Sequence, residues 1–328
     1  MSFSRFFYVE NAEIWDCFFN LELVFETVMV KKKKLSRNAI IGYPAGIITG
    51  VTYGLNPLFG KPLMDNGASI DTILFYRYFF AVVLLGGFLL LTKQSFKVTA
   101  KQAGVLLVLG VLYTMSSTTL FEAYKYIASG LATTLVFLYP VLVAIIMVFL
   151  RVVPSWQVWL SIIATFIGVI IMTMGDAGQS AVDPMGVLLS IVSASVYALF
   201  IVIINRSKTI SSISNSLLTF YALFTGVLIF LGKMLFHHTG MTEGVEGVAA
   251  WSNLVGLALL PTVVSTATLA LATRNIGATK ASVLGVFEPI TAILVGAIVF
   301  GEVLTANIVV GILISVVAIT FMITATKR

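Results

Sequence analysis

Long apolar runs are the feature that most constrains how this chain can fold. A helix needs about 20 mostly apolar residues to cross the hydrocarbon core of a bilayer. Apolar residues make up 59% of the chain and charged residues only 10%, whereas soluble domains carry about 25% charged residues. We therefore predict an all-α integral membrane protein with ten transmembrane helices, at residues 39–61, 72–92, 102–122, 129–150, 156–174, 185–204, 214–236, 249–272, 280–300 and 305–325.

The basic residues of the short connections fall mostly on one side of the predicted membrane. If the segment before the first span is cytoplasmic, fifteen lysines and arginines face the cytoplasm, and only Lys61, Lys125 and Lys233 face outward. Connections rich in lysine and arginine stay on the cytoplasmic side. The skew predicts a multi-pass protein of the cell (plasma or inner) membrane with both termini cytoplasmic. It also accounts for the net charge of +6 without a nucleic-acid partner.

Residues 1–38 are predicted to form a cytoplasmic N-terminal segment. Residues 1–28 hold five acidic residues among aromatic ones and lack the basic-then-apolar order of a signal peptide. Met29 begins "MVKKKKLSRN", which is typical of the cytoplasmic residues before a first span. Our hypothesis is that Met29 is the start and that residues 1–28 are not translated; the alternative is an amphipathic surface helix.

Two stretches 149 residues apart match each other. "AYKYIASGLATTLVFLYPVL" begins at Ala123 and "ATRNIGATKASVLGVFEPIT" begins at Ala272, and their identities include Pro140 and Pro289. Five spans is an odd number, so two five-span copies must enter the membrane from opposite sides. Inverted repeats of this kind are common in secondary transporters. We predict two inverted five-helix repeats, at residues 39–178 and 184–326.

Four segments of the sequence resemble the EamA type of the drug/metabolite transporter superfamily. They are "TYGLNPLFGKP", "FYRYFFAVVL", "EAYKYIASGLATTLVFLYP" and "FEPITAILVGAIVFGEVLT", and the resemblance covers roughly residues 39–326. It implies ten helices in two inverted halves and the movement of small metabolites, often outward, but it fixes no substrate. The first copy departs from the pattern in "FLRVVPSW", where Val153 stands in place of the expected glutamate.

A glutamate and a proline lie together inside the ninth apolar run. A charged side chain at mid-membrane costs about 2.5–3.5 kcal/mol, so Glu288 is expected to face a cavity or a partner. Pro289 has no N–H, and we expect it to free the carbonyl of Gly285 for another ligand. The pair would form a polar notch for a cation, an amine or a proton. The alternative is a buried glutamate that bonds to a neighbouring helix for packing.

Further candidates for the substrate site are Tyr53, Asn56, Tyr139 and Tyr197. Asn56 and Tyr53 lie late in the first span, where an amide in lipid is costly, and Tyr197 is expected to face them from the sixth span. Tyr139 stands where the second copy has Glu288. Arg77, in the second span, is expected to snorkel to the interface or to form a structural ion pair, with a carboxylate-binding role as the alternative.

Two prolines and a row of glycines are predicted to have structural roles. Pro140 and Pro289 are hinge candidates because they occupy equivalent positions in the two copies. A seam of glycines recurs every four residues in the first span, a pattern that lets helices pack closely within one chain or between the two chains of a homodimer. The seam consists of Gly42, Gly46, Gly50 and Gly54.

These features favour a secondary transporter that exports small polar metabolites, such as amino acids, by alternating access. The chain has no phosphate-binding loop for ATP, and we expect no cofactor and no catalytic residue. Proton coupling through Glu288 and uniport both stay open. We expect no metal site, because His237 and His238 are adjacent with no third ligand near and Cys17 is the single cysteine. The alternatives are a sugar or nucleotide-sugar carrier, a membrane-embedded enzyme or a scaffold.

Overall fold

The computed structural model describes residues 37–151, 155–173, 182–237, 240, 242–276, 281 and 284–325. Residues from Ala39 onward form one compact unit, and the earlier residues belong to a separate one. The predictions for residues 1–28 with Cys17, for the start at Met29, and for Val153 lie outside the described residues. So do the side chains of His237 and His238.

All regular structure in the described ranges is helical. Six segments are long and apolar enough to cross a membrane: residues 70–91, 100–123, 129–149, 184–206, 215–236 and 247–276. Shorter apolar helices cover 156–171, 287–299 and 306–321. The elements are α2 (Arg37–Gly54), α3 (Asn56–Asp65), α4 (Ile70–Leu91), α5 (Ala100–Ala123), α6 (Ser129–Val136), α7 (Tyr139–Phe149), α8 (Trp156–Thr173), α9 (Pro184–Arg206), η1 (Lys208–Ile210), α10 (Asn215–His237), α11 (Gly247–Ala258), η2 (Leu259–Val264), α12 (Ser265–Ile276), α14 (Phe287–Val299) and α15 (Ala306–Ala325).

Polar side chains set where several helices begin. Ser69 Oγ accepts a hydrogen bond from the N–H of Thr72 at 3.1 Å at the start of α4. Thr99 and Gln102 form a reciprocal capping box at the start of α5. Asp183 caps α9, where Pro184 occupies the first helical position. Each capping side chain accepts a hydrogen bond from an N–H group that has no partner within the helix. The polar residue just before the helix therefore sets where the span begins.

Three of the predicted spans contain a break, and a fourth departs from regular α-helix without a break. The first breaks at Leu55, between α2 and α3, and the fourth breaks between α6 and α7. The eighth contains the π-helical turn η2, and a turn at Gly285 and Val286 precedes α14. Because a proline removes an N–H and clashes with the preceding turn, it is tolerated best in the first turn of a helix. Pro140 and Pro289 both lie there.

The break in the ninth span corrects one prediction. We expected the carbonyl of Gly285 to lack a partner because Pro289 cannot donate to it. It instead accepts a hydrogen bond from the backbone N–H of Glu288 at 3.0 Å. The chain turns at this point, so the i→i+3 bond of the turn replaces the missing helical bond.

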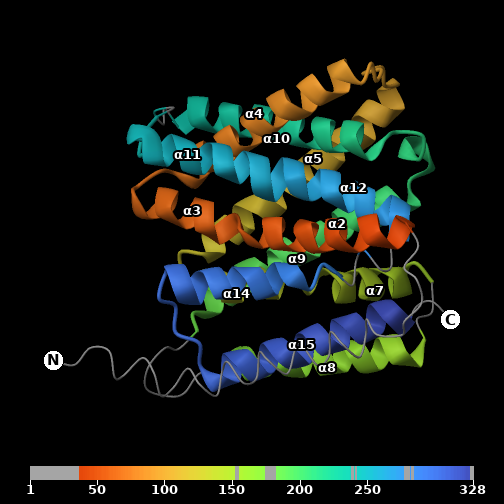
Figure 1. Ribbon diagram of the computed structural model, residues 1–328, viewed down its shortest axis with the longest axis vertical. Coiled ribbons are helices and arrows are strands. Elements are labelled where there is room, and N and C mark those ends of the chain that lie inside the picture. Colours follow the sequence, from red (N-terminus) through yellow and green to blue (C-terminus); the bar gives the residue numbers. More distant parts are fainter. Residues whose placement is uncertain are drawn as a thin grey trace. The chain divides into compact units, whose positions relative to one another are not determined.

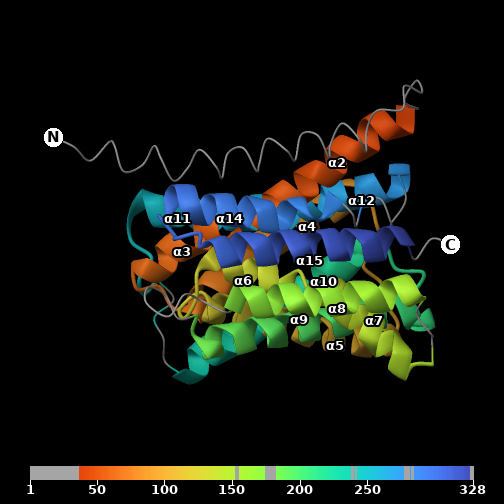
Figure 2. The same cartoon turned by 90° about the horizontal axis from the view of Figure 1, so that it is seen from below.

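Helices from the two halves of the sequence pack side by side. The most extensive contacts join α8 with α15, α5 with α9, α4 with α10, α5 with α10 and α6 with α14. Figures 1 and 2 both show α8 beside α15. Each pair joins a helix before residue 178 to one after residue 184. The two halves therefore share one large interface along their whole length, and any relative movement of the halves must change these contacts.

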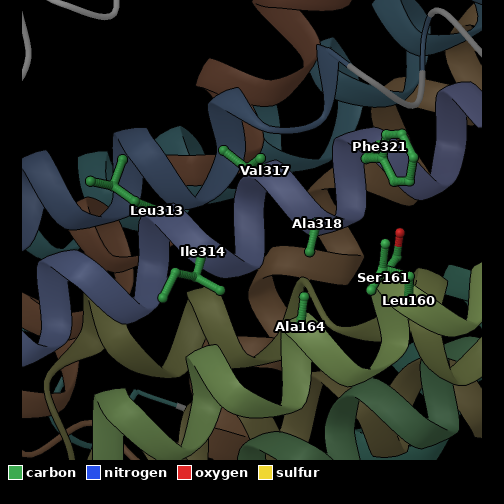
Figure 3. Close-up of a pocket in the computed structure, with 8 residues that line it drawn as sticks. All are labelled: Leu160, Ser161, Ala164, Leu313, Ile314, Val317, Ala318 and Phe321. Atoms are coloured by element: carbon green, nitrogen blue, oxygen red, sulfur yellow. The ribbon is translucent and has the colours of Figure 1, made fainter. Parts of the chain in front are cut away.

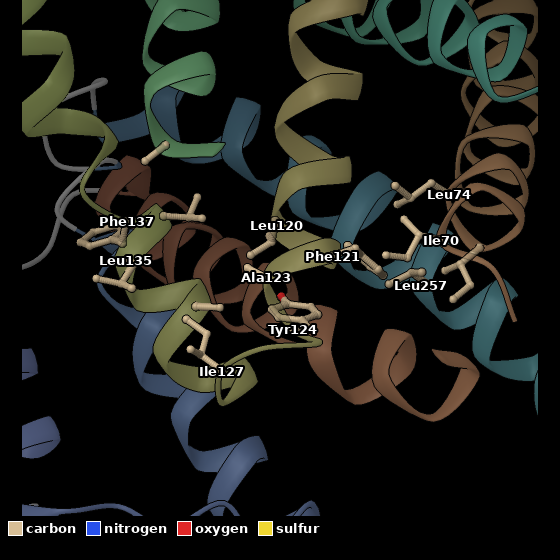
Figure 4. Packing of buried hydrophobic residues seen from close by; sticks show 14 of the residues in the cluster. Ile70, Leu74, Leu120, Phe121, Ala123, Tyr124, Ile127, Leu135, Phe137 and Leu257 are labelled. Atoms are coloured by element: carbon tan, nitrogen blue, oxygen red, sulfur yellow. The ribbon is translucent and has the colours of Figure 1, made fainter. Parts of the chain in front are cut away.

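The largest hydrophobic cluster of the described residues draws on most of the helices, from α3 and α4 to α15. Figure 4 shows Phe121 of α5 beside Leu74 of α4 and Leu257 of α11, with Tyr124 and Ile127 following in the connection to α6. The helices also expose large apolar side chains, including Leu91 of α4, Phe149 of α7 and Trp156 of α8. Such faces suit a lipid environment, because lipid tails are themselves apolar.

The two ends of the helices differ in charge. At one end, hydrogen bonds such as Gln102 Nε2 to the carbonyl of Thr209 join the connections after α4 and α9. From Ala39 onward, the described part of this basic end, on the right in Figure 1, has no acidic residue and holds Lys93, Lys97, Lys101, Arg151, Arg206, Lys208 and Arg274. The opposite, acidic end holds Asp65, Asp71, Glu122, Asp183, Glu243, Glu246 and Glu302. Its three lysines are all ion-paired, Lys61 with Glu302, Lys125 with Glu122 and Lys233 with Asp71.

Candidate functional site

Glu288 lies in the first turn of α14, directly after the Gly285–Val286 turn. Its side chain is partly accessible, and within the described ranges its carboxylate has neither a hydrogen-bond donor nor an ion-pair partner. The start of a helix carries partial positive charge, which favours a carboxylate there. The alternative that Glu288 bonds to a neighbouring helix therefore finds no support in the described contacts. Its carboxylate is free to accept a ligand.

The glycines of α2 let this part of α14 come close. A Cβ added at Gly54 would lie 2.5 Å from the carbonyl oxygen of Glu288, and one at Gly50 would lie 2.9 Å from that of Leu284. The first turns of α14 thus pack directly against the α2 backbone. The glycine seam is used within the chain, so a homodimer would need a different surface.

Three tyrosines from three other helices surround Glu288. Tyr53 of α2, Tyr139 of α7 and Tyr197 of α9 all lie within electrostatic range of its carboxylate. The rings of Tyr139 and Tyr197 meet edge to face with centroids 5.0 Å apart, and Tyr113 lies 6.5 Å beyond Tyr197. Phenol groups next to a carboxylate can orient a polar ligand without adding charge.

Asn56 is buried at the break between α2 and α3, with 1% of its surface exposed. Its Nδ2 donates to the backbone carbonyl of Tyr53 at 2.8 Å, while Oδ1 has no partner. Asn56 therefore bridges the break with one half of its amide and leaves an acceptor unused. The part of the chain that the structure describes contains no hydrogen bond between Asn56 and Tyr197, which packs on aromatic rings instead.

Arg77 does not snorkel, and it forms no ion pair with any residue that the structure describes, so both of those predictions are wrong. The side chain is 2% exposed, and no acidic partner for it exists among the described residues. Its Nε donates to Thr262 Oγ1 at 3.0 Å, and its guanidinium carbon lies 6.0 Å from the ring centroids of Tyr78 and Phe121. The sequence depth alone suggested an interfacial arginine, but the face of α4 that carries Arg77 packs against η2.

Most serine and threonine hydroxyl groups in the spans donate to a carbonyl of their own helix, as is common in helices. Thr118 donates to the carbonyl of Thr114 at 2.9 Å, for example. Other hydroxyl groups form contacts that join the halves, and two of these contacts lie between spans. Ser116 and Ser193 each donate to the other's backbone carbonyl, and Thr49 and Thr268 share a hydrogen bond of 2.8 Å.

Glu302 is a functional candidate that the analysis of the sequence did not single out. Its carboxylate accepts hydrogen bonds from Lys61 Nζ at 2.9 Å, from Ser129 Oγ at 2.7 Å and from the N–H groups of Ser129 and Gly130. Burial alone would raise the pKa of Glu302, but these hydrogen bonds outweigh it and hold the pKa below the ordinary 4.5. The Gly-Glu pair at the end of the ninth apolar run contains Glu302, but nothing in the sequence indicated which residues its carboxylate would bind.

An apolar cavity of about 420 Å³ lies apart from these groups, between α8 and α15 (Figure 3). Its single hydroxyl, that of Ser161, already donates to the carbonyl of Gln157 at 2.9 Å. The cavity offers no charge to a polar ligand and is not the candidate site. Its lining consists of Leu160, Ser161, Ala164, Leu313, Ile314, Val317, Ala318 and Phe321.

Comparisons with known proteins agree with this architecture. The model of the EamA-like transporter family matches residues 40–174 and 184–324. One solved structure, described only as "Crystal structure of protein", aligns with a TM-score of 0.62 over 88% of this chain and 98% of its own, at 15% identity. At that identity the likeness shows the fold alone. A comparison with curated proteins gives no match.

Proposed function

Because the chain belongs to the EamA-like transporter family, we propose that it is a secondary transporter that exports small polar metabolites such as amino acids. The family establishes a membrane transporter of the drug/metabolite type. The observation that carries the finer proposal is the carboxylate of Glu288, which has no partner in the described ranges and lies among tyrosines. That setting suits an ammonium group or a proton.

Helix breaks support a substrate site at this position. Asn56 begins α3, Tyr139 begins α7, and Glu288 lies in the first turn of α14. Discontinuous helices in transporters place helix termini and polar side chains around a site near the bilayer midplane. We assign the site to Glu288, Asn56, Tyr53, Tyr139, Tyr197 and Arg77, with Pro140 and Pro289 as the hinges beside it.

The transport mechanism that we propose is alternating access of two inverted five-helix halves. The first copy begins at the basic end with α2, and the second begins at the acidic end with α9, which supports ten spans and opposite insertion. Basic residues mark the cytoplasmic side, so the basic end would face the cytoplasm, with both termini there, in the cell membrane. Rocking of the halves would expose Glu288 to each side in turn.

A metabolite profile of the growth medium tests this proposal. Cells that produce the wild-type protein are compared with cells that produce Glu288→Gln at equal membrane abundance. Glu122→Gln is the matched control, because Glu122 is a carboxylate outside the site that pairs with Lys125. We expect a small set of amino acids to accumulate with the wild type and the control but not with Glu288→Gln, since the amide removes the negative charge.

The other outcomes separate the parts of the proposal. If Glu288→Gln exports as well as the wild type, transport stands, but Glu288 is structural and any proton coupling uses another group. If the wild-type protein leaves the medium unchanged, export is wrong, and uptake must be measured instead.

A further inference from the structure

We infer that Arg77 and the π-helical turn η2 form a carboxylate-binding subsite, so that the cargo of this transporter must carry a free carboxylate. This inference rests on the proposed function and deepens it, because it names the chemical class of the substrate. With the unpaired carboxylate of Glu288 as the site for an ammonium group, the cargo would be a zwitterionic amino acid rather than an amine, an amide or a sugar.

The first ground is the unbalanced charge of Arg77. Arg77 is 2% exposed, and its buried Nη2 has no hydrogen-bond acceptor among the described residues. Its neighbours are the Thr262 hydroxyl and the faces of two aromatic rings. A buried charge without a counter-ion is strongly unfavourable, and aromatic faces compensate only part of that. An anionic ligand would supply the missing partner.

The second ground is the way in which Arg77 is held. Its Nε donates to Thr262 Oγ1, and Thr262 in turn donates to the carbonyl of Leu257 at 3.2 Å, a contact that reaches back five residues in the π-helical turn. π-helical turns are rare and occur often at functional sites. Thr262 binds Nε of the guanidinium, whereas Nη2 has no acceptor in the part of the chain that the structure describes. Parallel N–H groups of a guanidinium match the two oxygens of a carboxylate.

The third ground is the position of the subsite between the two halves. Arg77 belongs to the first copy and Thr262 to the second. A movement of one half against the other would therefore separate this pair and open the guanidinium to a ligand. A site built this way would be buried in one state and reachable in another, which alternating access requires.

The fourth ground is that the same tyrosines lie near both charged groups. Tyr53 and Tyr124 each lie within electrostatic range of Arg77 and of Glu288. The cation and the carboxylate do not pair with each other in the described contacts. Separate sites of opposite charge suit a ligand that carries both charges.

Binding to purified protein in lipid nanodiscs tests the inference without relying on transport. The probes are the proteinogenic L-amino acids, the corresponding amino acid amides and decarboxylated amines, and the simple carboxylates lactate and succinate. Ligand-induced thermal stabilisation gives the apparent affinity for each probe. We expect amino acids to bind, and their amides and amines to bind roughly 10- to 150-fold more weakly, the factor for a lost charge-assisted hydrogen bond.

Variants at Arg77 then locate the effect. Arg77→Gln should weaken amino acid binding by the same factor while leaving the weak binding of amines unchanged. Arg77→Lys keeps the charge but loses the fork, so its affinity should lie between the two. Lys233→Gln is the matched control, because Lys233 is a cation outside the site that pairs with Asp71, and it should bind as the wild type does.

Other binding patterns would overturn the carboxylate subsite, the proposed cargo or both. If amides bind the wild type as tightly as amino acids, or if Arg77→Gln binds amino acids normally, the carboxylate subsite is wrong. If only amines bind, the subsite is wrong, whereas the role of Glu288 stands. If lactate and succinate bind but amino acids do not, the subsite stands and the proposed cargo is wrong. If no probe binds, both proposals fail. Because the comparison of probes uses the wild type, it tests the subsite even if the Arg77 variants do not fold.

Discussion

The carboxylate of Glu302 accepts four hydrogen bonds at the acidic end of the helices, three of them from α6 and one from α3. Its side chain is 9% exposed, so water competes little for these bonds. The residue follows α14, which belongs to the second copy, while its donors belong to the first. Glu302 therefore fastens the two halves together at one end.

We predict that Glu302→Gln destabilises the protein by about 1–3 kcal/mol, because charge-assisted hydrogen bonds are lost and the Ser129 donors are left poorly matched. Glu122→Gln should cost less than about 1 kcal/mol, since the Glu122–Lys125 pair is an exposed i,i+3 contact. Thermal and denaturant unfolding in detergent would compare the two variants. Equal losses would show that Glu302 is no more than a surface charge.

The same residue gives the protein a pH dependence of defined sign. The pKa of Glu302 in the folded state lies below its ordinary value of 4.5. Its stabilising contribution is therefore fully present above that ordinary value and is lost as the pH falls through the folded-state pKa. The stability difference between the wild type and Glu302→Gln should shrink across this acidic range. A difference that stays constant with pH would contradict the role of the charge.

At the scale of elements, the break before α14 places Glu288 where the backbones of α2 and α14 are in contact. Helix α2 carries glycines on the face that meets α14, so the turn before α14 and the first residues of that helix fit against bare backbone. A side chain at this contact would push α14 away and move Glu288 with it. The contact between α2 and α14 thus determines the position of Glu288 in the candidate site.

Gly54→Ala tests this close approach. The added Cβ would lie 2.5 Å from the Glu288 carbonyl oxygen and 2.7 Å from Thr291 Cβ, so we expect overpacking to cost about 1–3 kcal/mol. Gly87→Ala in α4 is the matched control, because a Cβ there meets nothing within 4 Å, and alanine favours a helix by about 0.5–1 kcal/mol. Unfolding midpoints should move in opposite directions. If both variants gain stability, α2 and α14 do not pack as closely as the structure indicates.

At the scale of the whole molecule, charge is sorted between the two ends. Among the described residues from Ala39 onward, the basic end has no acidic residue, and every lysine at the acidic end is ion-paired. Because unpaired lysine and arginine residues resist translocation across a membrane, this distribution favours the orientation that we propose, with the basic end in the cytoplasm.

Single-cysteine labelling would check that orientation. In a Cys17→Ser background, Lys97→Cys reports on the basic end and Lys125→Cys on the acidic end. We expect a membrane-impermeant maleimide to label Lys125→Cys in intact cells, and to label Lys97→Cys only after the membrane is made permeable. The reverse pattern would place the basic end outside and overturn the proposed direction of insertion.

The sequence by itself determined the class of the protein and the two-copy organisation. Apolar runs about 20 residues long require lipid, and that requirement depends on composition and length alone. The match between Pro140 and Pro289 likewise depends only on sequence register. Glu288 could be identified because a carboxylate inside an apolar run is costly wherever the run folds.

Only the tertiary structure decided which polar groups meet. The depth of Arg77 predicted an interfacial side chain, yet its α4 face packs against η2, and the sequence contains no sign of that pairing. Glu302 was visible as a residue, but its bonds to Lys61 and Ser129 join positions more than 170 residues apart. The hydrogen-bond partner of the Gly285 carbonyl depended on a turn, and hydropathy does not predict where a turn interrupts an apolar run. Periodicity and composition describe each helix by itself, whereas contacts between helices depend on how their faces are oriented toward one another.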